Sequence, residues 1–301
     1  MDSVVGAVLQ AGAVLVAAWL LAIPLTASTQ TELSAAVRGS HVLGTVDEIA
    51  PDWMRSIPRE FSALLDTSGL PEVIGPFGRT PPITEVEPPD GTTLDGPVPL
   101  ALHPSVLRIN GIAPSCQKAL EGSGFVVAPE RVMTNAHVVA GTTAVTVETE
   151  RGGPLEAEVV LFDPAVDVAI LAVPGLTAEP LVFADGTAES GTSAIVLGYP
   201  PGGGPYTASA ARVRESLQLQ GPDIYRAGTV EREVYTVRGS IRQGNSGGPL
   251  VDEQGRVLGV VFGAAVDDTD TGFALTADEV SRQLAMAGSS VTAVETGACI
   301  V

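Results

Sequence analysis

The stretch Gln243-Gly244-Asn245-Ser246-Gly247-Gly248-Pro249-Leu250 decides how the rest of the chain is interpreted. A serine that attacks a carbonyl needs backbone N–H groups that converge on the oxyanion, and a turn tight enough to aim them favours residues without a Cβ. The same letters also fit a glycine-rich turn between two strands. If Ser246 is a nucleophile, the remaining sequence must supply a base and an orienting acid.

The composition excludes several classes of partner. The chain has 301 residues, of which 45% are apolar, enough for a sizeable core. Its net charge of -19, without a Lys/Arg cluster, argues against nucleic acid. Neither Cys116 nor Cys299 has a second Cys or a His at metal-site spacing, so we expect no metal or other cofactor. The two cysteines either clasp the ends of one domain as a disulfide in an oxidising compartment or are unrelated thiols.

The N-terminal third differs in composition and hydrophobic patterning from the rest of the chain. Residues 4–26 form an almost wholly apolar run, which predicts a transmembrane helix within 1–28, the last span of a longer membrane domain. A cleaved signal peptide is the alternative, although its apolar part is shorter and follows a basic residue. Residues 29–70 place apolar side chains at helical spacing and predict juxtamembrane amphipathic helices. Residues 71–104 are proline-rich and predict an extended linker, which leaves 105–301 as the folded domain.

From residue 105 onward, short runs of β-branched and apolar residues alternate with turns, which is typical of an all-β sandwich or barrel. A single helix is predicted after Thr276, over 277–287. The predicted strands include 106–109, 124–127, 144–148, 157–162, 168–173, 194–197, 234–237 and 257–262.

The candidates for base and acid are few. Of the three histidines, two fall in the juxtamembrane segment and the linker, whereas His137 follows a predicted strand and turn and is the candidate base. Asp167 stands at the start of an apolar strand, where a charge is costly to bury without a partner, and is the candidate acid. Asp163 is the alternative, but it lies in a predicted exposed turn.

Chain order discriminates between two folds. The pattern G-x-S-x-G also occurs in α/β-hydrolases, but that fold needs its histidine after the serine, and no histidine follows Ser246. The order His137, Asp167, Ser246 is instead that of the chymotrypsin-like double β-barrel.

Three motifs stand in this order: Thr134-Asn135-Ala136-His137-Val138-Val139, Asp167-Val168-Ala169-Ile170-Leu171 and Gly244-Asn245-Ser246-Gly247-Gly248-Pro249-Leu250. With them, residues 105–300 resemble a trypsin-like serine protease of the bacterial envelope type. The predicted architecture is similar to that of the membrane-anchored periplasmic acid-resistance serine proteases of mycobacteria and related actinobacteria. The resemblance implies a chymotrypsin-like double six-stranded β-barrel with a C-terminal helix, preceded by a transmembrane helix and short juxtamembrane helices.

The resemblance also implies roles. Ser246 is the nucleophile, His137 the base and Asp167 the orienting acid, while the N–H groups of Gly244 and Ser246 form the oxyanion hole. Strand 260–265 is the edge that pairs with a substrate. The implied substrate-binding residues are Ser240, Gln243, Phe262, Gly263 and Ala264.

Two positions depart from the trypsin pattern. Ser240 stands where trypsin-like members carry the acid of the specificity pocket, which removes the reason to expect cleavage after Lys or Arg. Asn245 replaces the Asp that pairs with a freshly cut N-terminus in digestive members, so activation by N-terminal insertion is not expected.

The sequence therefore predicts a membrane-anchored serine endopeptidase with its protease domain on the periplasmic side, cleaving envelope proteins during envelope or acid stress. Turnover should fall in acid, because a histidine base must be neutral. The alternatives are an inactive membrane-tethered peptide-binding barrel and a membrane assembly protein.

Overall fold

The computed structural model describes residues 84–149, 153–199, 204–242, 244–265 and 270–300. The predicted transmembrane helix within 1–28 and the juxtamembrane helices within 29–70 lie outside these ranges. No helix among the described residues is long and apolar enough to cross a bilayer.

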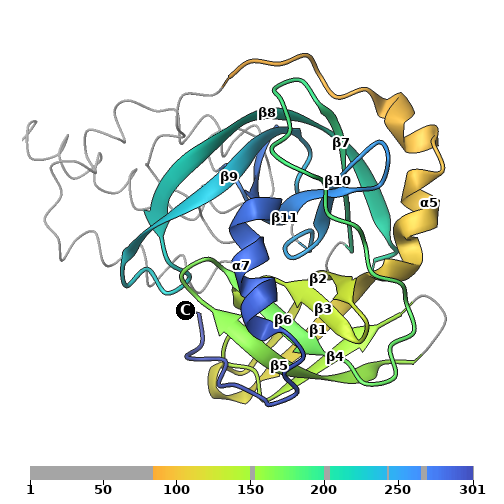
Figure 1. The fold of residues 1–301 in the computed structure, drawn as a ribbon. Coiled ribbons are helices and arrows are strands. Elements are labelled where there is room, and N and C mark those ends of the chain that lie inside the picture. Colours follow the sequence, from red (N-terminus) through yellow and green to blue (C-terminus); the bar gives the residue numbers. More distant parts are fainter. Residues whose placement is uncertain (1–83, 150–152, 200–203, 243, 266–269, 301) are drawn as a thin grey trace, which may run out of the picture.

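The strands form two closed antiparallel barrels (Figure 1), which confirms the predicted double six-stranded fold. The first has the order β1-β2-β3-β6-β5-β4, and the second the order β10-β11-β12-β9-β8-β7. The first barrel consists of β1 (Val106–Ala113), β2 (Lys118–Ala128), β3 (Arg131–Thr134), β4 (Ala144–Glu148), β5 (Leu155–Asp163) and β6 (Val168–Ala172). The second consists of β7 (Ser193–Gly198), β8 (Thr207–Pro222), β9 (Thr229–Gly239), β10 (Pro249–Asp252), β11 (Val257–Ala264) and β12 (Thr271–Thr276).

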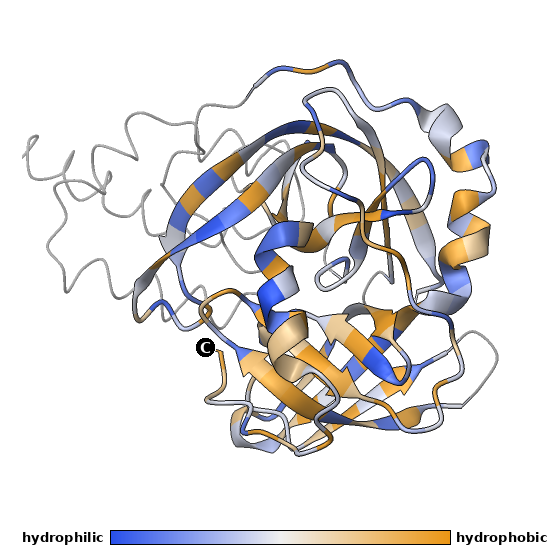
Figure 2. Ribbon diagram, viewed as in Figure 1, coloured by the Kyte–Doolittle hydropathy of each residue, from blue (hydrophilic) through white to orange (hydrophobic). Residues whose placement is uncertain are grey.

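Several strands are apolar on both faces because each face packs against a different core. In β6, Ala169 and Leu171 belong to the core of the first barrel, whereas Ile170 belongs to a cluster shared by both barrels. In β7, Val196 packs inside the second barrel and Leu197 joins the shared cluster. Successive side chains of a strand point to opposite faces, so a continuous apolar run serves two cores. Figure 2 shows mostly hydrophobic strands in the lower, first barrel and an alternating pattern along β8 of the second.

Short helices complete the described chain: η1 (Gly91–Asp95), α5 (Val98–Leu102), η2 (His103–Ser105), η3 (Pro114–Cys116), α6 (Ala136–Val139) and α7 (Ala277–Ala287). Helix α7 has the predicted bounds. Its N-cap Thr276 accepts a hydrogen bond from Glu279 N at 3.1 Å. The helix lies across both barrels and contacts strands of each (Figure 1).

The described part of the expected linker packs against the second barrel instead of standing extended. Leu94, Val98 and Leu102 contact the shared core, and their spacing of four residues places them on one side of the segment. Arg214 donates to Thr84 O at 3.2 Å, and Arg238 donates to the backbone of the same segment. Residues 84–105 therefore form a strap over the second barrel.

Candidate functional site

His137 and Asp167 lie side by side because β3 pairs with β6, with Thr134 opposite Ala169. His137 lies in α6, directly after β3, and Asp167 precedes β6. The Nδ1 atom of His137 lies 2.8 Å from Asp167 Oδ2, and the His137 backbone N–H donates to Asp167 Oδ1 at 2.9 Å. A carboxylate only accepts, so Nδ1 is the donor of this bond, and in a neutral imidazole Nε2 is then the acceptor.

The turn before β6 fixes Asp167 in a left-handed conformation with a φ of 71°. Its carbonyl accepts from Asn135 Nδ2 at 2.8 Å, and its N–H donates to Asp163 O at 2.9 Å. Asp163, the alternative candidate for the acid, instead forms hydrogen bonds within the turn. Its Oδ1 accepts from the N–H groups of Ala165 and Val166 at 3.0 and 3.1 Å. Asp163 thus shapes the turn that presents Asp167.

Ser246 lies in the second barrel, in the loop between β9 and β10. Two backbone hydrogen bonds join the loop to β11. Gly247 N donates to Val261 O at 2.8 Å, and Val261 N donates to Gly248 O at 2.9 Å. Gly247 has a φ of 81°, and a Cβ there would lie 2.2 Å from Ser123 O. Both the conformation and the space therefore require glycine beside Ser246.

Ser123 of β2 ties this loop to the first barrel. Its N–H donates to Ser246 O at 2.8 Å, and its hydroxyl donates to Gly244 O at 2.6 Å. The same hydroxyl accepts from Tyr199 N at 2.9 Å. Ser123 is not among the residues predicted from the sequence, although a polar residue at the start of the apolar run 124–127 is a signal for such a role.

The structure brings Ser246 into the neighbourhood of His137 without a hydrogen bond between their side chains. A Cβ on Gly122 would lie 3.2 Å from Ser246 O and 2.6 Å from Val138 Cγ2, so the loop and α6 are neighbours. His137 and Ser246 are only 7% and 2% exposed. Nevertheless, neither His137 Nε2 nor Ser246 Oγ has a hydrogen-bond partner in the described part of the chain.

The residues predicted to bind substrate differ in how deeply they are buried. Phe262 is buried, and its ring centroid lies 6.3 Å from that of Phe273, so its side chain packs in the core. Gly263 is buried and Ala264 half-buried in the same strand, whereas Gln243 lies outside the described residues. Ser240 is exposed and its hydroxyl accepts from Arg242 Nε at 3.3 Å.

Ile241 is a neighbour of this region that sequence reasoning does not single out. A Cβ on Gly272 would lie 2.2 Å from Ile241 Cδ1, so the isoleucine side chain covers that glycine. The chain beside Ser240 therefore presents an apolar side chain and no carboxylate.

Cys116 and Cys299 form a disulfide with a Cα–Cα distance of 6.0 Å. A Cβ on Gly141, two residues after α6, would lie 2.9 Å from Cys299 Sγ. The bridge therefore packs the C-terminal segment against the chain that follows His137. Among the residues described, no group of three or more His, Cys, Asp or Glu side chains is arranged to hold a metal ion.

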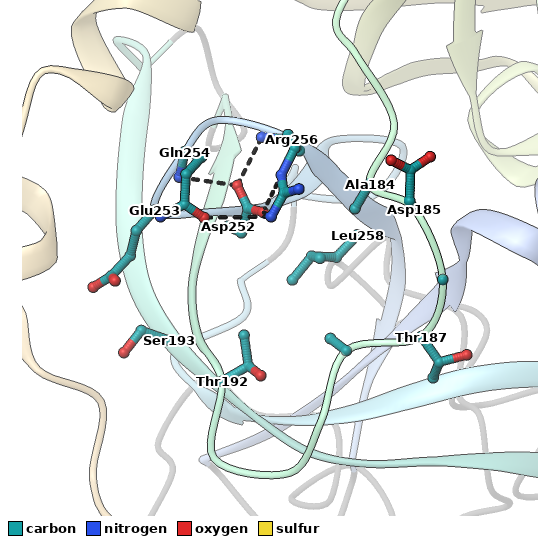
Figure 3. A pocket seen from close by; sticks show the side chains of 12 residues that line it. Ala184, Asp185, Thr187, Thr192, Ser193, Asp252, Glu253, Gln254, Arg256 and Leu258 are labelled. Carbon is teal, nitrogen blue, oxygen red and sulfur yellow. Dashed lines mark hydrogen bonds and ion pairs between the residues drawn. The ribbon is translucent and has the colours of Figure 1, made fainter.

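A separate cavity of about 260 Å³ lies at one end of the second barrel, beside the turn that joins β10 to β11. Figure 3 shows Asp252 and Arg256 joined on one side of it, with Leu258 toward the middle. The Arg256 Nη2 to Asp252 Oδ2 distance is 2.7 Å. None of the predicted site residues lines this cavity.

Comparison with known proteins identifies relatives over the whole chain. Residues 122–260 match the family described as "Trypsin-like peptidase domain". The chain is 57% identical over 302 residues to the serine protease Rv3671c of Mycobacterium tuberculosis, covering 100% of this chain and 75% of the relative. The crystal structure of the active form of that protease matches with a TM-score of 0.71 at 56% identity, covering 76% of this chain and 100% of the other. Its inactive form matches with a TM-score of 0.61 at 55% identity, covering 68% and 100%.

Proposed function

The chain belongs to the trypsin-like serine proteases, and we propose that it is an endopeptidase that cleaves cell-envelope proteins through Ser246, His137 and Asp167. One observation carries the assignment of these three residues. A buried His–Asp pair leaves His137 Nε2 without a partner, and the neighbouring loop buries a serine Oγ that also has none among the described residues. A buried polar atom is normally paired, so an unpaired imidazole nitrogen and an unpaired hydroxyl in adjacent segments support their assignment as reacting groups.

In the proposed reaction, Ser246 Oγ attacks the scissile carbonyl while His137 Nε2 accepts its proton. The Oγ–C bond forms, the carbonyl becomes an oxyanion, and the imidazolium is stabilised by the carboxylate of Asp167. The imidazolium then gives its proton to the leaving amine as the peptide bond breaks, leaving an acyl-enzyme. Water hydrolyses this ester by the same steps, and Ser246 is restored.

The oxyanion is proposed to bind the N–H groups of Gly244 and Ser246. Gly244 has a φ of 85°, a conformation that favours glycine, and its carbonyl is held by the hydroxyl of Ser123. Each such donor is worth about 3 to 4 kcal/mol of barrier in a preorganised site. The hydrogen bond from Ser246 Oγ to His137 Nε2 must still form, and catalytic hydrogen bonds of this kind often tighten only when substrate binds.

The substrate backbone is proposed to pair with β11. Strand β10 pairs with β11 as far as Val260, and no strand of the described chain pairs with that edge beyond it. An extended peptide can add there through main-chain hydrogen bonds. Ser240 and Ile241 offer no carboxylate to a basic side chain, and the exposed Arg242 beside Ser240 would repel one. We therefore propose that cleavage does not require Lys or Arg before the scissile bond.

Two observations support the proposals that residues 4–26 anchor the chain in the membrane and that the protease domain lies on the periplasmic side. The first is the apolar run itself. The second is the disulfide, which persists in oxidising compartments and is rare in the cytosol. A role in envelope or acid stress follows from the resemblance to the membrane-anchored acid-resistance proteases.

The test compares wild type with Ser246→Ala, using Ser281→Ala as the control because Ser281 is an exposed serine on α7. We expect a fluorophosphonate probe to label wild type and Ser281→Ala but not Ser246→Ala. Mapping of new termini in envelope proteins should give cleavage sites that disappear in Ser246→Ala alone. A folded wild-type protein that neither reacts with the probe nor cuts peptides would instead indicate a peptide-binding barrel.

A further inference from the structure

We propose that Arg232, in the second barrel, is a positioning residue that holds the turn bearing Asp167 in the first barrel. This inference rests on the proposed function, because it assigns Arg232 a role in the alignment of Asp167 with His137. Arg232 lies in β9 and is only 6% exposed.

Two hydrogen bonds fix the guanidinium. Its Nε donates to Ala165 O at 2.7 Å, and its Nη2 donates to Pro222 O at 3.1 Å. Ala165 lies two residues before Asp167, whereas Pro222 ends β8. The planar fork of an arginine can hold two acceptors in one fixed arrangement. Arg232 therefore joins the acid-bearing turn to the β8–β9 hairpin.

The same turn is held at two further points, one on the same hairpin and one on α7. Ile224 N, at the tip of the β8–β9 hairpin, donates to Pro164 O at 3.4 Å. Gln283 of α7 donates to Asp163 Oδ2 at 3.2 Å. Of these contacts, the bond from Arg232 is the shortest and the only one from a cationic donor, and charge-assisted hydrogen bonds are roughly twice as strong as neutral ones.

The hairpin tip also touches the segment that carries the base. Ile224 is 7% exposed and packs with Ala136 and Ala140, which flank His137 and the rest of α6. One hairpin of the second barrel therefore contacts both the helix of His137 and the turn of Asp167. Movement of this hairpin would displace the two groups relative to each other.

Charge supports the same assignment. Burial lowers the pKa of Arg232, and the carboxylates that oppose this effect are, in order, Asp167, Asp223, Asp163 and Glu279. They come from the turn, the hairpin tip and α7, the elements packed around the guanidinium. Asp167 is the first of them, so the positive charge of Arg232 helps to stabilise the carboxylate that orients His137.

The test uses the full chain with Arg232→Met and Arg232→Lys. Arg131→Met is the matched control, because Arg131 is also a buried arginine, 8% exposed, and donates to the carbonyls of Ser289 and Ser290 away from the site. Peptide hydrolysis is measured from acid to neutral pH, together with thermal unfolding of each variant.

We expect Arg232→Met to lower kcat by about 10- to 100-fold, because a small misplacement of catalytic groups has effects of this size. The Arg232 guanidinium also lies over the ring of Phe262 in β11, 5.8 Å from its centroid. KM should stay within about twofold, since methionine keeps a favourable contact with that ring. The acid limb of the pH profile should move to higher pH, because loss of a positive charge near Asp167 favours the protonated form of His137. Arg131→Met should lower the unfolding temperature while its kcat and acid limb remain those of wild type.

Arg232→Lys keeps the charge but not the fork, so its acid limb should match wild type while kcat falls. If Arg232→Met does not unfold cooperatively, Arg232→Lys becomes the deciding variant. A kcat of Arg232→Lys equal to that of wild type would then overturn the proposal. Equal kcat and equal acid limbs in Arg232→Met and Arg131→Met would also overturn it. If wild type itself neither reacts with fluorophosphonate nor cleaves peptide, the proposed function fails, which is a different result from an active wild type unaffected by substitution of Arg232.

Discussion

Replacement of Ser123 by alanine tests whether the first barrel holds the loop of Ser246 in its active shape. The hydroxyl of Ser123 makes two hydrogen bonds to buried backbone groups, 2.6 Å to Gly244 O and 2.9 Å to Tyr199 N. Alanine removes both and leaves the strand pairing of β2 unchanged. The loop would then lose the contact that fixes the carbonyl beside the proposed oxyanion hole.

The magnitude follows from the number of bonds lost. Loss of a partner by a buried backbone group costs about 1 to 3 kcal/mol, so two such losses give about 2 to 6 kcal/mol. Ser105→Ala is the matched control, because Ser105 is a buried serine whose hydroxyl makes one hydrogen bond, 2.6 Å to Glu179 O, outside the site. It should lose less than half as much stability, because Glu179 is exposed and water can replace the lost donor.

The assay pairs urea unfolding with peptide turnover well below the unfolding midpoint. Ser123→Ala should lower kcat by about tenfold or more, since loss of a whole oxyanion donor costs about 100- to 1,000-fold. Ser105→Ala should retain the wild-type kcat. The reasoning is refuted if Ser123→Ala unfolds at the same urea concentration as Ser105→Ala and turns over like wild type.

Three further predictions concern other parts of the site. Gly247→Ala should abolish turnover and destabilise the fold, whereas Gly175→Ala, with a similar φ of 83° but no heavy atom within 4 Å of the added Cβ, should cost only about 1 to 2 kcal/mol in thermal unfolding. Reduction of Cys116–Cys299, which are 183 positions apart, should lower stability by up to about 5 kcal/mol, and an unchanged melting temperature with reductant would contradict this. Arg242→Glu should increase cleavage after Lys and Arg in a peptide library, and an unaltered preference would remove the proposed repulsion.

The sequence predicts the barrels better than it predicts every strand in them. Runs such as that of β6 are recognisable because both faces are buried and almost every residue is apolar. Strand β8 is not predicted, because its Arg, Glu and Gln residues favour no strand locally and its pairing with β7 and β9 overrides propensity. Residues 84–104 are expected to be extended from their prolines, yet three apolar residues at a spacing of four dock them on the second barrel.

Within the site, the residues predicted from chemistry differ from those that only the structure reveals. His137 and Asp167 are predicted because a serine nucleophile needs a base and an acid, and the chain offers few. Ser123 acts on Gly244 from 121 positions away, a relation that no local pattern records. Arg232 does have a signal in the sequence. Strand alternation places it on the same face as Val230 and Val234, where a charge requires a partner.

The disulfide determines whether the pieces of a cleaved chain separate. Because Cys116 and Cys299 lie near the two ends of the barrel region, a single cut anywhere between them leaves both pieces covalently joined. A single self-inflicted cut between the two cysteines would therefore leave the band of the intact chain unchanged on a gel run without reductant. A cut in the segment before Cys116 would release everything on its N-terminal side. Gels run with and without reductant thus separate shedding of the barrels from internal nicking.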